Sequence, residues 1–444
     1  MSTPTTSPDV VHSPATRRRL FASTMIGNTV EYYDFTLYGT LAAVIATHFF
    51  PKGETTVALL AAYAGVALSY FVRPLGALVL GPLADLKGRR PILVFTILLM
   101  TIGTAGIGLL PTYAAVGVAA PVLLLTMRIL QGIGASVEIT TAANFLVEHE
   151  DKRRRNLVLG TLNSTASIGS LLAAGLAFVF TQTMSSAAFS SWGWRIPFLL
   201  AIPLSAVGIY IRNKLDETPE FEAVQRLAEE QQVPQTPLRT AIKYYWPDML
   251  RSIGVSAGQR IGSFVIQAYF VTAMITAGFP TSLALLASMI TYVVGPAPSI
   301  YGGYLADKYG ARLPLLIGYG LFILLTVPTF IGIGSHSIVL ATLAVVVFTI
   351  INNIISAPML AAAVLSFPSE VRSSASALNF NVATSLIGST AGLVAVWLHE
   401  RTGSDVTFGW YMTGFCTLSF LVTVFALPTG ARRTHNTALL AERA

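Results

Sequence analysis

Charge is scarce in this sequence, because Asp, Glu, Lys and Arg make up only 11% of its 444 residues. A soluble domain usually carries about 25% charged residues, so most of the surface is predicted to avoid water. The one cysteine, Cys416, excludes internal disulfides and is interpreted as a packing residue. The sequence has no phosphate-binding loop, no nucleophile motif and no metal-ligand spacing. We therefore expect no enzymatic activity and no bound metal or cofactor.

The sequence is instead rich in long apolar segments, and 53% of its residues are hydrophobic. Each run is long enough to cross a bilayer core about 30 Å thick. Lipid offers the backbone no hydrogen-bond partners, so each run is predicted to be a helix. The sequence predicts an all-α polytopic membrane protein with about twelve spans, at residues 20–49, 57–83, 91–110, 119–147, 157–183, 194–212, 248–277, 282–305, 313–333, 337–366, 373–398 and 408–428.

The net charge of +7 is unevenly distributed. With the N-terminus inside, the cytoplasmic segments hold 22 of the 28 Lys and Arg residues, the outer segments three and the spans three. This asymmetry follows the positive-inside rule and predicts a cell (plasma or inner) membrane protein with both termini in the cytoplasm. The basic balance therefore reports topology, and we expect membrane lipid, and no nucleic acid, as a partner.

The chain divides around a hydrophilic centre. Residues 213–247 are rich in Gln and Glu and include Pro234 and Pro237, which predicts a cytoplasmic linker with room for a short surface helix. The linker separates an N-terminal six-helix half at 20–212 from a C-terminal six-helix half at 248–428. Residues 1–19 are predicted to be a disordered cytoplasmic tail, and residues 429–444 a second tail. The first apolar run is too long for the core of a signal peptide, so it is counted as a span.

A charged loop occurs twice, with its two aspartates 222 residues apart. The copies read Gly-Pro-Leu-Ala-Asp-Leu-Lys-Gly-Arg-Arg at 81–90 and Gly-Tyr-Leu-Ala-Asp-Lys-Tyr-Gly-Ala-Arg at 303–312. Parallel six-helix repeats around a cleft are the plan of rocking transporters. Charged pairs at the cytoplasmic mouth could close an inner gate and break when it opens. Anchoring by positive charge is the alternative role for the candidate gating residues, Asp85, Arg89, Arg90, Asp307 and Arg312.

This loop resembles the hallmark of the major facilitator superfamily. Further motifs resemble the metabolite:H⁺ symporter family, which includes carriers for proline/betaine, shikimate, α-ketoglutarate and citrate. They are Gly-Asn at 27–28, Glu-Tyr-Tyr-Asp-Phe at 31–35, Tyr-Gly at 38–39, Phe-Phe-Pro at 49–51, Arg-Pro-Leu-Gly at 73–76, Arg-x-x-Gln-Gly at 128–132, Trp-Gly-Trp-Arg-Ile-Pro-Phe at 192–198 and Glu-Thr-Pro-x-Phe at 217–221. The resemblance implies that spans one, four and seven line a central cavity.

Two departures from the family pattern weaken the transfer of any relative's substrate. Ser136-Val137-Glu138 stands where relatives usually have Gly-Gly-Glu, and these bulkier residues should alter the pocket or its packing. Ala311 stands in the second loop where an arginine would complete the motif.

Ionisable groups inside spans are expensive and by default functional. By helical rise, most lie about 15–21 Å from the inner span ends, and Arg128 about 30 Å. Gly27, Glu31, Asp34 and Tyr38 share one helix face, as do Arg128, Gln131 and Glu138, and as do Arg260, Ser263 and Gln267. Six groups lie deep in the spans: Glu31, Asp34, Arg73, Arg128, Glu138 and Arg260.

A proton-coupled carrier needs a carboxylate whose proton affinity depends on conformation. Burial raises the pKa of a carboxylate and a nearby arginine lowers it. We hypothesise that Asp34 and Arg128 form this switch, with Glu138 or Glu31 sharing the role. The alternative is a set of static ion pairs, in which Glu31 could neutralise Arg73.

Arg73 and Arg260, one in each half, suggest the substrate, because a guanidinium presents a planar fork that suits carboxylates. Both could instead be structural. The candidate substrate-binding residues are Arg73, Arg260, Tyr33, Tyr38, Gln131, Asn163 and Gln267. Asn352, Asn353, Asn379 and Asn381 could line the cavity or join helices.

We therefore expect a monomeric secondary transporter that uses protons and alternating access to import a small organic anion, either a mono- or dicarboxylate or a hydroxy-acid, or a zwitterion. One alternative is a proton-driven exporter of a metabolite or drug, although residues 157–183 lack the proline of the motif typical of drug antiporters. The other is a membrane metabolite sensor that does not transport.

Overall fold

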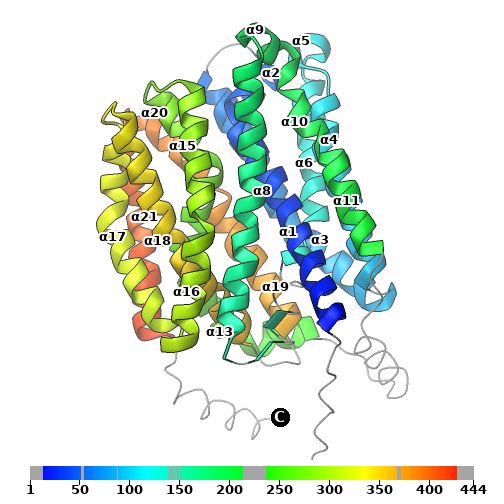
Figure 1. The fold of residues 1–444 in the computed structure, drawn as a ribbon, viewed down its shortest axis with the longest axis vertical. Helices are drawn as coiled ribbons and strands as arrows, with labels where there is room; N and C mark the ends of the chain where they lie inside the picture. Colours follow the sequence, from blue (N-terminus) through cyan, green and yellow to red (C-terminus); the bar gives the residue numbers. More distant parts are fainter. Residues whose placement is uncertain are drawn as a thin grey trace, which may run out of the picture.

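A computed structural model describes residues 14–51, 55–87, 89–139, 143, 146–147, 150–151, 153–213, 237–367 and 372–427. Its described residues form helices and connecting turns without any strand, which confirms the predicted all-α class. Eight helical segments are long and apolar enough to cross a membrane, and the shorter apolar helices Val94–Leu109 and Ala119–Gly134 add to them. The helices stand side by side in an elongated bundle (Figure 1).

The first half is built from α1 (Pro14–Thr40), α2 (Ala42–Phe49), α3 (Thr55–Lys87), α4 (Arg89–Leu109), α5 (Tyr113–Val116), α6 (Ala119–Gly134), α8 (Arg155–Thr183), α9 (Ser186–Ala188), the π-helical turn η1 (Phe189–Gly193), α10 (Arg195–Leu199) and α11 (Ala201–Asn213). Several predicted spans consist of two consecutive helices. The first span breaks between α1 and α2 at Leu41, and the span predicted at 194–212 combines α10 and α11.

The second half is built from α13 (Pro237–Phe264), η2 (Val265–Tyr269), α14 (Phe270–Thr276), α15 (Thr281–Val294), α16 (Pro296–Tyr309), α17 (Arg312–Ile333), α18 (Ile338–Leu365), α19 (Arg372–Ala383), η3 (Thr384–Gly388), α20 (Ala391–Thr402) and α21 (Val406–Phe425). α13 begins at Pro237, inside the predicted linker, while residues 214–236 of that linker lie outside the described part of the chain.

Close helix contacts depend on small residues, as is usual in membrane bundles. Within the first half, α8 packs along α1. A Cβ added at Gly169 of α8 would lie 2.1 Å from the backbone carbonyl oxygen of Thr29 in α1. No side chain fits this contact, so glycine is required for α8 to lie this close to α1.

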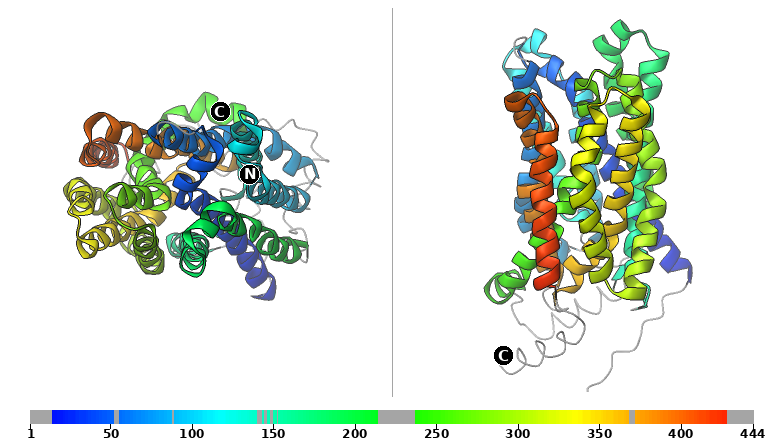
Figure 2. Two further views of the ribbon diagram at one scale, coloured as in Figure 1. Left: turned by 90° about the horizontal axis from the view of Figure 1, so that it is seen from above. Right: turned by 90° about the vertical axis from the view of Figure 1, so that its left-hand side faces the viewer.

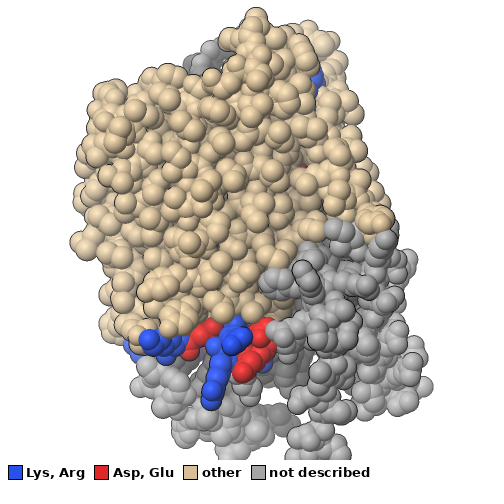
Figure 3. All heavy atoms as spheres, viewed as in Figure 1, with Lys and Arg blue, Asp and Glu red and all other residues tan. Residues whose placement is uncertain are grey.

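Seen along the bundle, the helices of the two halves form two groups (Figure 2). The groups meet where α8 packs against α15 and α16, where α1 packs against η2, and where α3 packs against α19 and α20. On the face shown in Figure 3, charged side chains gather at one end of the bundle, where α8 begins and α16 ends. We call this the charged end. The other end, which carries α2, α5 and α9, is called the opposite end (Figure 1).

Candidate functional site

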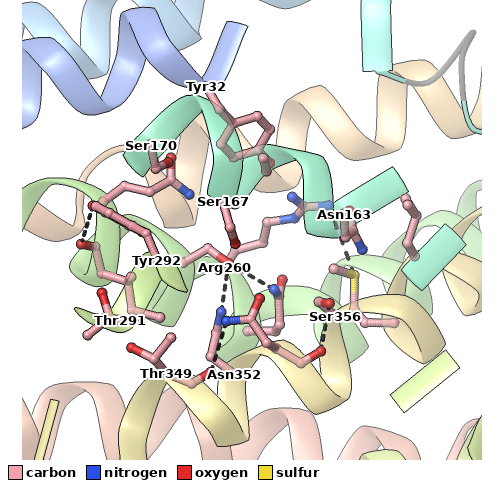
Figure 4. Close-up of a pocket in the computed structure, with 18 of the residues that line it drawn as sticks. Tyr32, Asn163, Ser167, Ser170, Arg260, Thr291, Tyr292, Thr349, Asn352 and Ser356 are labelled. Atoms are coloured by element: carbon pink, nitrogen blue, oxygen red, sulfur yellow. Dashed lines mark hydrogen bonds between the residues drawn. The ribbon is translucent and has the colours of Figure 1, made fainter. Parts of the chain in front are cut away.

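A small cavity of about 60 Å³ lies between the two halves. The first half contributes residues of α1 and α8 to its wall, and the second half contributes residues of α13, η2, α15, α18 and α19 (Figure 4). Ligand pockets usually measure roughly 300–1,000 Å³. The helices around this cavity must therefore separate before it can admit a solute larger than a few water molecules.

Arg260 of α13 is the charged residue of this cavity (Figure 4). Its side chain is 7% exposed, and its guanidinium carbon lies 3.8 Å from the centroid of the Phe380 ring. Its Nη2 donates to the thioether sulfur of Met359 at 4.0 Å, which is a weak acceptor. Within the described chain, no carboxylate forms an ion pair with Arg260 and its Nε has no acceptor. The guanidinium thus presents unused donors to an anion.

The remaining cavity wall is dominated by hydroxyl and amide groups. Ser263, one turn after Arg260 on α13, accepts hydrogen bonds from Nε2 of Gln259 at 2.8 Å and from Nδ2 of Asn352 at 3.1 Å. Asn353 and Ser356 of α18 also line the cavity, together with Asn163, Ser167 and Ser170 of α8. A wall of this kind can hold a polar solute by many hydrogen bonds.

Of the seven predicted substrate residues, Arg260, Asn163 and Gln267 line the cavity. The other four, Arg73, Tyr33, Tyr38 and Gln131, are buried outside its wall. Tyr33 donates to the backbone carbonyl of Pro197, and Tyr38 donates to that of Ala62 at 3.2 Å. A role for these four in substrate contact remains a prediction that this geometry does not support.

Arg73 is neutralised inside the first half. Its Nη1 lies 2.8 Å from Oε1 of Glu31, and the two side chains are 2% and 3% exposed. Its guanidinium also packs on the rings of Phe35 and Tyr70, 4.4 Å and 4.1 Å from their centroids. The pairing matches the structural alternative for Glu31 that the sequence left open, so Arg73 and Glu31 act here as a buried ion pair.

Arg128 and Asp34 lie near each other but are not joined by a hydrogen bond. Arg128 is fully buried, donates to Oε1 of Gln131 at 2.8 Å and packs on the Tyr38 ring at 4.1 Å. Asp34 is 2% exposed and close to Thr104 and Arg128, yet neither carboxylate oxygen has a partner with hydrogen-bond geometry. The interaction of this carboxylate with Arg128 would therefore change if the two helices moved relative to each other.

Glu138 is also buried, 4% exposed, and within electrostatic range of Asp34. Its neighbour Ile139 lines the cavity, as does Tyr32, the residue that follows Glu31 in α1. Along the chain, Glu31 and Glu138 are therefore each one residue away from the cavity wall, and Asp34 is two residues away.

At the charged end, Asp307 of α16 joins the two halves. Its Oδ1 accepts from the backbone N–H and the Nδ2 of Asn156, at 3.0 and 2.7 Å, and its Oδ2 accepts from the backbone N–H of Leu157 at 2.9 Å. Asn156 and Leu157 lie in the first turn of α8, where N–H groups lack helical partners and the helix dipole favours a negative charge. Asp307 therefore caps a helix of the opposite half.

The other predicted gating residues divide into two groups. Arg312 donates from Nη2 to the backbone carbonyl of Val424 at 2.6 Å, a contact within the second half. The side chains of Asp85, Arg89 and Arg90 lie outside the described part of the structure. Only Asp307 can therefore be placed in a contact between the halves.

Nearer the opposite end, the two halves are joined by Tyr63 of α3, which the sequence did not single out. Its hydroxyl lies 2.8 Å from the backbone carbonyl oxygen of Ala268 in η2 and 2.8 Å from Oγ1 of Thr272 in α14. In a π-helical turn the backbone hydrogen bonds are displaced from their α-helical partners. Tyr63 thus binds the second half at an irregular turn next to the cavity residue Gln267.

Sequence reasoning also missed Gln259, Tyr292, Met359 and Phe380 in the cavity wall. Gln259 could have been found, because it precedes Arg260 and stands one turn before Ser263 on α13. The aromatic and thioether residues carried no signal, since their side chains look the same in a cavity wall as in a lipid-facing helix. Asn352 and Asn353 do line the cavity, whereas Asn379 and Asn381 donate to Ser252 and to the backbone carbonyl of Ser136.

The chain is similar in sequence to known transport proteins. Residues 24–393 match the family model of the Major Facilitator Superfamily. The chain is 30% identical over 422 residues to the proline/betaine transporter of Escherichia coli strain K12, covering 93% of this chain and 82% of that protein. It is 30% identical over 425 residues to the glycine betaine/proline/ectoine/pipecolic acid transporter OusA of Dickeya dadantii, covering 93% and 83%.

A solved structure shares the fold. The partially occluded, inward-open xylose transporter XylE from Escherichia coli superposes with a TM-score of 0.75 at 15% identity. The superposition covers 94% of this chain and 99% of that protein.

Proposed function

The chain belongs to the Major Facilitator Superfamily and is therefore a secondary transporter and not an enzyme, and we propose that it couples protons to the import of a small carboxylate-bearing solute. Its named relatives carry proline and betaine, which are zwitterions with a single carboxylate. A small zwitterion of this kind, or a hydroxy-acid of similar size, is the cargo that the proposal favours.

The observation that carries the proposal is the unpaired guanidinium of Arg260. A buried cation without a counter-ion is unfavourable, and an arriving carboxylate removes that cost while gaining charge-assisted hydrogen bonds. Met359 is the acceptor that the carboxylate would displace, and a thioether is easily displaced. Phe380 supports the flat face of the guanidinium, which leaves its edges available to the substrate.

The coupled proton is assigned to Asp34, with Arg128 as its conformational partner. In the present arrangement Arg128 is engaged by Gln131 and the Tyr38 ring, and Asp34 has no hydrogen-bond donor. A movement that brings Arg128 onto Asp34 would favour the ionised carboxylate and release the proton. Glu31 is the weaker candidate to share this role because Arg73 already neutralises it, and Glu138 is the stronger one.

Alternating access requires that each end of the cavity opens in turn. Asp307 is proposed to hold the charged end closed by capping α8, and Tyr63 to hold the opposite end closed. We assign the charged end, with both termini, to the cytoplasm on the basis of the positive-inside asymmetry. Rocking of residues 20–212 against residues 248–428 would break one set of contacts while preserving the other.

Uptake into proteoliposomes tests the proposal directly. Proline, glycine betaine, lactate and succinate are offered with and without an inside-alkaline pH gradient, and accumulation of one of them only with the gradient is expected. Arg260→Gln should raise the KM of that solute roughly 10- to 100-fold, because charge-assisted hydrogen bonds are worth about 1.5–3 kcal/mol. Arg251→Gln is the matched control, since Arg251 is 49% exposed and pairs with Asp248 on its own helix.

The same experiment separates the competing functions. Efflux of the solute from loaded vesicles, driven by the pH gradient, would indicate an antiporter. Binding of the solute without any flux would indicate a sensor. An unchanged KM in Arg260→Gln would remove the proposed anchor.

A further inference from the structure

The charge of the cavity wall limits how many carboxylates the substrate can carry. Arg260 is the one charged side chain among the described residues that line the cavity. The other arginine predicted for substrate, Arg73, is paired with Glu31 away from the wall. A second carboxylate buried in this cavity would find hydroxyl and amide groups but no cation, and burying an unpaired charge is strongly unfavourable.

The amide groups beside Arg260 favour a substrate that carries hydrogen-bond donors in addition to its carboxylate. The nitrogen atoms of Gln259 and Asn352 both donate to Ser263. Their oxygen atoms, Oε1 of Gln259 and Oδ1 of Asn352, are buried without a hydrogen-bond partner. Both side chains are 3% exposed. A buried acceptor left unpaired is costly, so a ligand that supplies donors is favoured over one that does not.

The spacing of these groups matches a compact molecule. Gln259 and Arg260 are adjacent on α13, and Ser263 lies one turn further on. Residues one turn apart on a helix are separated by about 5–6 Å at their Cβ atoms. Since Arg260, Ser263 and Asn352 line the same cavity of about 60 Å³, a carboxylate bound to Arg260 shares one small space with the acceptors around Ser263.

We infer that the substrate carries one carboxylate and, one to three carbons away, at least one N–H or O–H donor directed to Gln259 or Asn352. This inference rests on the proposed function and narrows it to amino- and hydroxy-monocarboxylates. It disfavours dicarboxylates, and it disfavours fully N-methylated betaines, whose quaternary nitrogen has no hydrogen to donate.

The aromatic residues support the same selection. A quaternary ammonium is best held by several aromatic faces. Phe380 is the aromatic residue packed against Arg260, and its face is already occupied by the guanidinium at 3.8 Å. The hydroxyl of Tyr292 donates to the backbone carbonyl of Ile266 at 3.1 Å, which fixes that ring in the wall. Tyr32 is the third aromatic residue of the described wall, so two rings, those of Tyr32 and Tyr292, remain for a methylated cation.

Equilibrium binding to the purified, detergent-solubilised protein tests the inference without requiring transport. The probes form matched series. L-Proline, N-methyl-L-proline and N,N-dimethyl-L-proline carry two, one and no N–H donors on the same ring. Lactate and 2-methoxypropanoate differ by one O–H donor, and 4-hydroxybutyrate and succinate differ by a second carboxylate. Isothermal titration gives the Kd of each compound.

Within whichever series binds, loss of the last donor should weaken binding roughly 5- to 150-fold, the range expected for a buried acceptor left unpaired. Succinate should bind more weakly than 4-hydroxybutyrate. In Gln259→Met and Asn352→Leu the preference for donors should shrink, because each variant removes one acceptor. Two variants are used so that the conclusion survives the misfolding of either.

Equal or tighter binding of N,N-dimethyl-L-proline or succinate would overturn this inference, as would the failure of every donor-bearing acid to bind at millimolar concentration. A different result would contradict the proposed function. Unchanged affinity in Arg260→Gln removes the carboxylate anchor itself, whereas donor-independent binding that still requires Arg260 removes only the donor requirement.

Discussion

Replacing Asp307 by Asn should open the charged end of the bundle. The carboxylate accepts three hydrogen bonds from Asn156 and Leu157, two of them from backbone N–H groups in the first turn of α8. Asparagine keeps one acceptor oxygen and substitutes an NH₂ group for the other, so a backbone N–H loses its partner. The favourable interaction between the negative charge and the helix dipole is lost as well.

The expected magnitude follows from these contacts. Loss of a charge-assisted hydrogen bond costs about 1.5–3 kcal/mol, and loss of the dipole interaction costs about 0.3–1 kcal/mol. Asp307 is only partly buried, so solvent reduces both contributions and we expect a total of about 1–3 kcal/mol. This corresponds to a shift of roughly 5- to 150-fold toward the state that is open at the charged end.

Cysteine accessibility measures this shift. The single native cysteine, Cys416, is buried and can be replaced by Ser. A reporter, Ser299→Cys, is then placed in α16 at a fully buried site whose hydroxyl contacts the backbone carbonyl of Gly160 in α8. Asp307→Asn should raise the rate at which a membrane-impermeant maleimide labels the reporter from the charged end.

The matched control is Asp248→Asn, the same chemical change at an exposed residue paired with Arg251 on its own helix. It should leave the labelling rate unchanged. Equal labelling of Asp307→Asn and the parent protein would refute the assignment of Asp307 as a contact that holds the two halves together.

Three further changes give distinct expected outcomes. Asp34→Asn should abolish uptake driven by a pH gradient while substrate exchange persists, and concentrative uptake by this variant would contradict the proton assignment. Glu31→Gln should lower the free energy of unfolding by about 3–5 kcal/mol, because it leaves the buried Arg73 without a counter-ion; a thermal unfolding temperature equal to that of the parent would argue against a tight pair. Gly169→Ala should prevent stable folding because its Cβ would lie 2.1 Å from a backbone oxygen, whereas Gly175→Ala, with 3.7 Å of clearance, should give normal yields in detergent-solubilised expression tests.

The fold was largely predictable because a helix that crosses the bilayer requires a long apolar segment, which is easily recognised in the sequence. Apolar runs, the scarcity of charge and the repeated loop identify the helices and the two halves without reference to packing. The interruptions within the spans could not be predicted in this way. The interruption at Leu41 and the π-helical turns η2 and η3 contain no proline, the residue that most often marks a break in a helix.

The candidate site was predictable in part. Helical spacing correctly placed Arg260, Ser263 and Gln267 on one face, and all three line the cavity. The same reasoning could not tell which arginine remains unpaired, since Arg73 and Arg260 look alike in sequence. Their difference comes from the distance between α1 and α3, which brings Glu31 to 2.8 Å from Arg73 and leaves Arg260 with Met359.

The division of charge between the halves has a thermodynamic consequence. The cation in the cavity wall belongs to the second half, whereas the buried acids Glu31, Asp34 and Glu138 belong to the first. In the proposed mechanism, proton and substrate therefore influence each other through the interface between the halves. Such linkage is reciprocal: the factor by which protonation tightens substrate binding is the factor by which substrate tightens proton binding. Proton uptake measured while the purified protein is titrated with substrate would thus report the coupling strength without any membrane.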